Sequence, residues 1–376
     1  MKKWVHLTMI ITLVFLLSGC WDQRYFKEVK LALASGFDLA KDGKLITTAS
    51  LPNISKSPQG PGVESIQIVT VKADTPRQSR VKLDRKISKT FDSSKMRVLL
   101  FGKKIAKGGI YPLLDIFYRD PTSALNMNLG VVDGRAEDAI RLPINGENKP
   151  SEYLSGILNS ASRSTLIGKE ETIQGIAGRM LDPGQDVLLP YLKVYKQRGI
   201  VDVVGLAIFN GDRYTGKNLT SDESTLYLLM NGYRGDVARL TEKVLKNQSN
   251  HFKSFLTLEV KNQKIKKKVH VDPNGRISAD LSLKLSVRII EYPKDKLNHT
   301  KTVVFLDKKL TKILTERAEK VVKKLQKADC DGFGIGRRLM AYYRPTWDEI
   351  DWNKTYPTIK IHSKVDVEIL QHGIVY

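Results

Sequence analysis

The fold is decided by the stretch FLTLEVKNQKIKKKVHVDPNGRISADLSLKLSVRII, residues 255–290. Apolar and polar residues alternate in both halves of this stretch, which is typical of strands that bury one face and leave the other in water. The residues between the halves, Asp272-Pro273-Asn274-Gly275, have the composition of a turn. The pattern therefore predicts antiparallel strands, whose buried face carries Leu256, Leu258, Val260, Leu281, Leu283, Leu285, Val287 and Ile289.

The segments around this stretch complete a C-terminal domain. Residues 306–325 carry an apolar stripe at helical spacing, which predicts a long helix that covers the sheet. Residues 359–369 alternate again and predict a last strand, and a shorter helix is predicted at residues 221–231. Residues 199–376 are therefore predicted to form an α+β domain of antiparallel sheet packed with long helices.

The N-terminal half alternates strand-like and helix-like segments up to about residue 182. This order predicts a mixed α/β domain over residues 20–198. The whole chain is then α+β with two domains, and three domains in all is the alternative for a chain of 376 residues.

One helix of this half has a basic outer face. Thr75-Pro76 is typical of a helix start, and Leu83, Ile87 and Phe91 follow at four-residue spacing. The helix predicted from Pro76 to Phe91 buries these three side chains. Its outward residues are then Arg80, Lys82, Arg85, Lys86 and Lys89.

Residues 1–19 are typical of a secretory signal. Lys2 and Lys3 precede an apolar run from Trp4 to Leu17, which is shorter than the ~20 residues that a membrane-spanning helix needs. The ending Leu17-Ser18-Gly19-Cys20 resembles the bacterial lipobox. This resemblance implies cleavage between Gly19 and Cys20 and a diacylglyceryl group on the Cys20 sulfur, with N-acylation of the new terminus. The alternative is an ordinary signal in which Cys20 is incidental.

Charge and cysteine content limit the function classes. The chain has 62 basic and 40 acidic residues, a net charge of +22, and removal of residues 1–19 leaves +20. With Cys20 lipidated, Cys330 has no disulfide partner. The carboxylates of Asp329 and Asp331 beside it disfavour a thiolate, so we interpret Cys330 as structural.

No catalytic or metal-binding pattern emerges from the sequence. The nucleophile motif Gly-x-Ser-x-Gly is absent, and the histidines are scattered without the spacing of metal ligands. Asp331-Gly332-Phe333-Gly334-Ile335-Gly336 follows a predicted helix where a nucleotide-binding loop follows a strand, which favours a structural turn. We therefore predict a protein that is not an enzyme and that uses no cofactor and no metal.

The basic run Lys264-Ile265-Lys266-Lys267-Lys268 allows three interpretations. It could bind nucleic acid, but the predicted export excludes nucleic acid as a physiological partner. It could guard the solvated edge of a hairpin, or it could lie against an anionic lipid surface, where each basic side chain adds ~1 kcal/mol.

Cys20-Trp21-Asp22-x-Arg24 resembles the start of the mature Ger(x)C proteins, the lipoprotein C-subunits of the nutrient germinant receptors of spore-forming bacteria. Tyr25-Phe26 departs from the Glu-Leu or Glu-Ile of that family. Further short elements resemble the family in the expected order: Gly102-Lys103, Leu113-Leu114-Asp115, Arg119-Asp120, Ala136-Glu137-Asp138, Gly205-Leu206-Ala207-Ile208-Phe209, and Asp331 to Gly336 followed by Trp347, Trp352 and Pro357.

The resemblance implies a non-catalytic subunit needed for the germination response to small nutrients. It implies palmitate-type lipidation at Cys20, a place on the outer face of the spore's inner membrane, and membrane-embedded partners of the A and B type. A lipid-anchored extracytoplasmic solute-binding protein is the alternative, and an envelope hydrolase is the third. As the face that docks to the partners or the membrane, we predict Lys82, Lys86 and Lys89.

Overall fold

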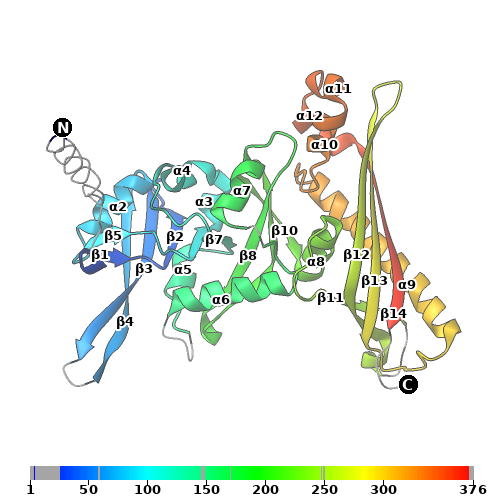
Figure 1. Cartoon of the computed structure of the whole chain (residues 1–376), viewed down its shortest axis with the longest axis horizontal. Helices are drawn as coiled ribbons and strands as arrows, with labels where there is room; N and C mark the ends of the chain where they lie inside the picture. Colours follow the sequence, from blue (N-terminus) through cyan, green and yellow to red (C-terminus); the bar gives the residue numbers. More distant parts are fainter. Residues whose placement is uncertain are drawn as a thin grey trace.

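The computed structural model describes residue 4 and residues 26–57, 60–144, 149–169, 171–246, 248 and 250–371. Nearly all of the predicted signal, Cys20 and the first family motif lie outside the described residues. The described chain forms two bodies side by side along the long axis, one around an eight-stranded sheet and one around a four-stranded sheet (Figure 1). The predicted α+β class is therefore confirmed.

The eight-stranded sheet is parallel at its centre and antiparallel at both ends. β2, β6, β7 and β8 run parallel, whereas β3 and β4 on one side and β9 and β10 on the other run antiparallel to their neighbours. In spatial order the strands are β10 (Arg213–Thr220), β9 (Ile200–Asn210), β8 (Leu188–Tyr195), β7 (Asn128–Val132), β6 (Val98–Gly102), β2 (Ala34–Leu39), β3 (Leu45–Ser57) and β4 (Gly60–Ala73).

Helices cover both faces of this sheet, because its central strands are apolar on both sides. On β6, Val98 and Leu100 join one buried cluster, and Leu99 and Phe101 join the other, as alternation along a strand requires. α5 (Ala136–Ile140) and α6 (Pro150–Arg163) pack on the first cluster. The second cluster lies under α2 (Pro76–Asp84), α3 (Lys103–Gly108), α4 (Tyr111–Arg119) and α7 (Ile173–Met180).

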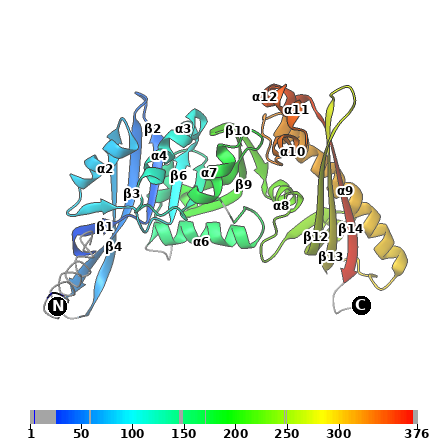
Figure 2. The same ribbon diagram turned by 45° about the horizontal axis from the view of Figure 1, so that its top comes forward.

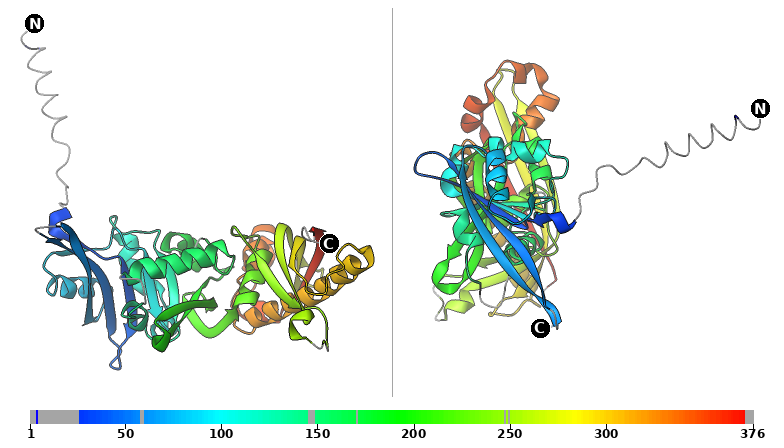
Figure 3. Two further views of the ribbon diagram at one scale, coloured as in Figure 1. Left: turned by 90° about the horizontal axis from the view of Figure 1, so that it is seen from below. Right: turned by 90° about the vertical axis from the view of Figure 1, so that its left-hand side faces the viewer.

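A short parallel pair lies beside this sheet, where the described chain begins. After the turn η1 (Phe26–Glu28), β1 (Val29–Leu31) pairs with β5 (Thr90–Asp92). β3 and β4 also continue together well beyond the part of β3 that pairs with β2, and form a two-stranded arm (Figure 3). The arm and the β1–β5 pair lie at the end of the molecule farthest from the four-stranded sheet.

The second body contains the predicted hairpin. β11 (Arg239–Lys243), β12 (Phe255–Val271), β13 (Ile277–Glu291) and β14 (Lys360–Gln371) form its sheet, and the long α9 (Thr300–Gln326) lies along one face (Figure 2). All eight inward residues predicted for the hairpin are buried. α8 (Ser221–Met230) lies between the two bodies, and α10 (Ile335–Tyr342), α11 (Arg344–Asp348) and α12 (Trp352–Thr355) lie near the turn of the hairpin. Three 3-10 turns complete the described elements: η2 (Lys196–Arg198), η3 (His251–Ser254) and η4 (Tyr356–Thr358).

The prediction that this sheet is antiparallel was wrong at its last strand. β14 pairs parallel with β13, with Ser278 opposite Lys360 and Val287 opposite Ile369. The reason is the crossover: α9 carries the chain back along the sheet, so the last strand starts at the same end as β13. Alternation fixes which residues face inward but is the same for either strand direction.

The helix predicted from Pro76 to Phe91 is shorter than predicted. It ends at Asp84, whose carboxylate accepts a hydrogen bond from the Phe91 N–H at 2.7 Å. Ile87 lies in the following turn and Phe91 lies in β5. The two side chains still pack on the same cluster as Leu83, which explains why their spacing imitated a helical stripe.

The domain boundary placed between residues 198 and 199 falls between β8 and β9, which are neighbours in one sheet. In the described part of the chain, no helix has both the length and the apolar composition to cross a membrane.

Candidate functional site

The predicted basic face lies along the outer edge of the eight-stranded sheet. Lys82 is half-buried on α2, and Lys86 and Lys89 are exposed in the turn after it. The Lys82 ammonium donates to the Lys72 carbonyl at 2.7 Å, and the Lys86 ammonium donates to the Thr70 carbonyl at 3.2 Å. Both carbonyls belong to β4, the edge strand, so these two lysines cover part of a free strand edge.

Arg80 does not belong to this face, contrary to the prediction. Its guanidinium lies between the rings of Phe91 and Phe117, 5.9 Å from each centroid, and pairs with the Asp120 carboxylate at 2.5 Å. Burial opposes the charge on Asp120, but hydrogen bonds from Thr122 and Arg80 lower its pKa to about 2. Arg80 therefore fastens α2 to the end of α4 and is not available to a partner.

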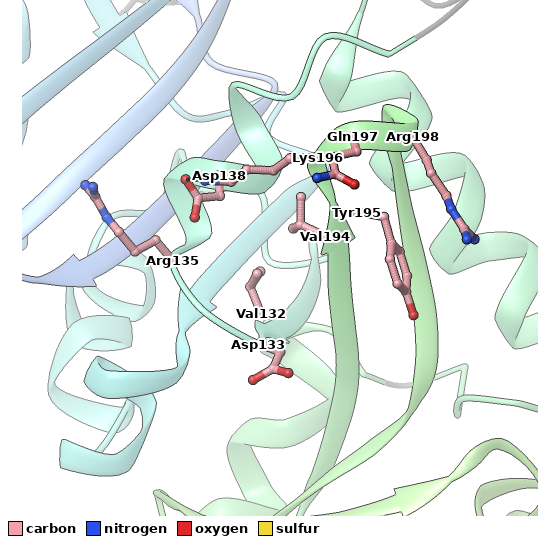
Figure 4. A pocket seen from close by; sticks show the side chains of 9 residues that line it. All are labelled: Val132, Asp133, Arg135, Asp138, Val194, Tyr195, Lys196, Gln197 and Arg198. Atoms are coloured by element: carbon pink, nitrogen blue, oxygen red, sulfur yellow. Dashed lines mark ion pairs between the residues drawn. The ribbon is translucent and has the colours of Figure 1, made fainter.

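A second candidate lies where the parallel strands end. In open α/β sheets, ligands bind at the carboxyl ends of the strands. Here a hollow of about 450 Å³ opens between the ends of β7 and β8, and Asp133, Arg135, Asp138 and Lys196 line it (Figure 4). A neighbouring hollow of about 490 Å³ shares Asp133 and Arg135 and extends to the end of β2.

The acid side chains of these hollows are already engaged. Asp133 pairs with Lys103 at 2.8 Å, and Asp138 pairs with Lys196 at 2.9 Å. The buried Asp38 carboxylate accepts the N–H groups of Ala136 and Glu137, at 2.9 and 3.0 Å. These pairings hold the ends of the strands together.

The glycine-rich motif at residues 331–336 joins the two bodies. The buried Asp331 carboxylate accepts the N–H groups of Ile335 and Gly336 at 3.0 and 2.7 Å, at the start of α10. The Asp331 N–H donates to the Asp186 carboxylate of the first body at 2.6 Å. Gly336 is required because a Cβ there would lie 2.4 Å from the indole nitrogen of Trp352. The structural interpretation of this motif therefore fits its contacts.

Cys330, next to this motif, is completely buried. Burial raises the pKa of its thiol well above the ordinary value, and the carboxylates of Asp186 and Asp331 raise it further. A thiol held in this form is a poor nucleophile, in agreement with the structural role predicted for it. Within the described ranges, no three His, Cys, Asp or Glu side chains come together in the way a metal ion requires.

One residue that the sequence analysis did not separate from its neighbours is Lys267. Lys264, Lys266 and Lys268 are exposed on the outer face of β12, as predicted for a solvated run. Lys267 points to the opposite face, toward Asn231 at the end of α8. The period-two pattern of the sequence could have separated Lys267 from its neighbours, because Lys267 has the same strand phase as the partly buried Ile265 and Val269.

Two domain models match the chain in succession. The one described as the spore germination protein N-terminal domain matches residues 22–194, and the one described as spore germination B3/GerAC like, C-terminal, matches residues 204–373. The change between them falls in the interval that contains η2 and the start of β9.

Full-length relatives and a solved structure agree with these matches. The chain is 22% identical to the spore germination protein GerQC of Bacillus cereus over 378 residues, covering 100% of this chain and 99% of the relative. It is 23% identical to the spore germination protein KC of Bacillus subtilis (strain 168), covering 99% and 97%. The crystal structure of the GerBC protein resembles it with a TM-score of 0.53 at 17% identity, over 90% of this chain and 98% of that one.

Proposed function

The chain belongs to the spore germination family of GerC-type subunits, and we propose that it is the lipid-anchored, non-catalytic subunit of a nutrient germinant receptor. The observation that carries this proposal is the succession of the two domain models, which together span residues 22–194 and 204–373. The similarity to GerQC and KC over nearly the whole length of both proteins supports the same role for the complete chain.

We propose that the protein acts by contact with membrane-embedded subunits of the A and B type. Two features support a contact role. The two bodies are arranged in an elongated row, and the acid side chains at the ends of the parallel strands are occupied by ion pairs and backbone N–H groups. The alternative, a solute-binding protein, is built from hinge-linked doubly wound lobes. The second body here has four strands and a single long covering helix instead.

The anchor is tested at Cys20. Cys20→Ala removes the only thiol that the lipobox resemblance allows to be acylated, so we expect an unlipidated, mislocalised protein and weakened germination on nutrients. Two acyl chains hold a protein stably on a membrane, whereas one chain does not. Ser18→Ala keeps a small residue two positions before Cys20 and should be processed normally. Mass spectrometry of the mature N-terminus decides the question, because an unmodified Cys20 or a cut elsewhere contradicts the proposal.

We propose that Lys82, Lys86 and Lys89 form the face that docks to acidic partner loops or anionic headgroups. The pairing of β1 with β5 supports a docking face near the membrane anchor. Val29 lies opposite Thr90, so Lys89, the residue before Thr90, lies beside the start of the described fold. If Lys30 marks the start of the fold, the tether from Cys20 is about ten residues, which allows at most ~35 Å of reach. The face is therefore held near the membrane.

Charge reversal of these three lysines to Glu tests the docking face. None of them is in the buried core, and the hydrogen bonds that Lys82 and Lys86 donate to β4 are exposed, so folding should be preserved while receptor assembly or the germination rate falls. The matched control is reversal of Lys264, Lys266 and Lys268, which are exposed on the second body and change the net charge equally. Normal germination of spores that hold the first variant at normal level places the docking face elsewhere.

A further inference from the structure

Lys267 places a cation on the buried side of an apolar sheet. β12 alternates, and the inner face of the sheet packs against α8 and α9 through Leu281, Leu283 and Leu285 of β13. The Lys267 ammonium donates to the Asn231 side-chain oxygen at 2.5 Å and to the Phe333 carbonyl at 3.1 Å. It also lies 5.7 Å from the centroid of the Phe333 ring. Neutral oxygens and an aromatic face surround the charge.

No carboxylate of the described residues lies within ion-pair distance of this ammonium, whereas Arg239, Lys284, Arg317 and Lys324 elsewhere in the second body each have such a partner. Burial, and to a smaller extent the charge of Arg338, lower the pKa of Lys267 to about 8, and the carboxylate of Asp331 only partly offsets these two effects. The Asp331 carboxylate is itself bound to the N–H groups of α10. Among the described residues, Lys267 therefore has no counter-ion within ion-pair distance.

The ammonium borders a cleft of about 530 Å³ at the junction of the two bodies. Its walls come from the loop before α7, from α7 itself, from the end of α8, from β12 and from the glycine-rich loop. Two further cations, Lys169 and Arg179, line it, and so does the acid Glu171, which pairs with Arg179 at 3.3 Å. Asn231, Tyr233 and Gln185 add polar side chains to the wall. A cleft of this size accommodates a small molecule.

We propose that this cleft binds a small ligand through a carboxylate or phosphate group that pairs with Lys267. An anionic oxygen beside the ammonium would supply the missing counter-charge, and a charge-assisted hydrogen bond of this kind is about twice as strong as a neutral one. The cleft is formed by both bodies, so a bound ligand would contact both at once. The proposal goes beyond the receptor role above and does not depend on lipid anchoring.

Isothermal titration tests the proposal with two probes, inorganic phosphate and succinate. The mature chain in detergent is titrated at pH 7 and fixed ionic strength. We expect at least one probe to bind, and we expect Lys267→Met to weaken its affinity by about tenfold or more. Lys268→Met removes an exposed charge from the next position of the same strand and should bind as the unaltered protein does. Binding of phosphate alone or of succinate alone identifies the anionic group.

A second measurement follows the pKa of Lys267 in the unaltered protein. Reductive methylation with ¹³C-formaldehyde labels the lysines, and the Lys267 signal is the one missing from a Lys267→Met sample. An anion that prefers the charged amine tenfold raises its pKa by about one unit. The proposal is overturned if neither probe binds, if Lys267→Met binds as tightly as the unaltered protein, or if the pKa of Lys267 does not rise when the probe is bound.

Discussion

Lys267→Met should stabilise the protein at neutral pH. A buried ammonium without a counter-ion is destabilising, and methionine keeps the linear, apolar part of the side chain. The pKa falls from an ordinary 10.5 to about 8 on folding, which corresponds to a cost of about 3 kcal/mol at pH 7. The substitution also leaves the Asn231 oxygen and the Phe333 carbonyl without this donor, at about 1–2 kcal/mol. We therefore expect a net gain of about 1–2 kcal/mol.

The pH dependence separates this explanation from a general packing effect. Above pH 10.5 the amine is neutral in the folded and unfolded states, and its burial costs nothing. As the pH falls from 10.5 toward 8, the amine of the unfolded chain takes up a proton while the buried amine of the folded chain stays neutral. The free energy of unfolding of the unaltered protein therefore decreases over this window. The advantage of Lys267→Met should therefore shrink by about 1 kcal/mol between pH 7 and pH 9.

Urea unfolding of both proteins at these two pH values, followed by circular dichroism, measures the difference. Lys268→Met, exposed on the same strand, should change the free energy of unfolding by less than about 0.5 kcal/mol at either pH. If Lys267→Met is destabilising at pH 7, or if its effect does not change with pH, the ammonium is not an uncompensated buried charge. The argument for an anionic ligand would then lose its electrostatic basis.

Two further substitutions, one within each body, test buried contacts and should be followed by thermal or urea unfolding. Arg317→Met leaves the buried Glu242 carboxylate, now 2.6 Å from the guanidinium, without its partner, and should cost about 3–5 kcal/mol. Removing Arg344 from its exposed pair with Asp348 should cost no more than about 0.5 kcal/mol, and equal losses at both sites would contradict the role of burial. Gly205→Ala places a Cβ 2.0 Å from the Leu219 carbonyl oxygen at a φ of +146°, so we expect a loss above about 2 kcal/mol, and an unchanged melting temperature would show that β9 can shift.

The sequence predicted most of the fold where a local pattern has only one structural solution. Alternation over residues 255–290 identified the eight buried side chains predicted for β12 and β13. It did not show the register shift between Val260 and Asn262, after which Ile265, Lys267 and Val269 face inward. It could not determine the direction of β14, because alternation is the same for a strand read in either direction. The helix after Pro76 was predicted too long for a related reason: the cluster that receives Leu83 also receives Ile87 and Phe91 from a turn and a strand.

The candidate site depended more on contacts between distant residues. Arg80 was predicted to face outward because its helical phase is polar, but Asp120, forty positions away, draws it inward. Lys267 was counted with a basic run because charge alone does not show which face of a strand a residue occupies. Its phase does show this, so applying the strand period to Lys267 as well as to Ile265 would have identified it. The Asn231 partner becomes visible only in three dimensions.

Directional polar bonds at the junction explain how the two sheets keep one relative orientation, although the core of the second body is continuous with the cluster on one face of the eight-stranded sheet. Apolar burial between the bodies is compatible with many relative orientations, because it depends on area and not on direction. The Asp186–Asp331 bond at 2.6 Å and the bond from the Tyr227 hydroxyl to the Gly332 carbonyl at 2.8 Å select one orientation. Lys267 reaches the same glycine-rich loop through Phe333. An anion bound there would compete with the Phe333 carbonyl for the Lys267 ammonium. Binding in the cleft would therefore weaken one of the contacts that hold the glycine-rich loop between the bodies.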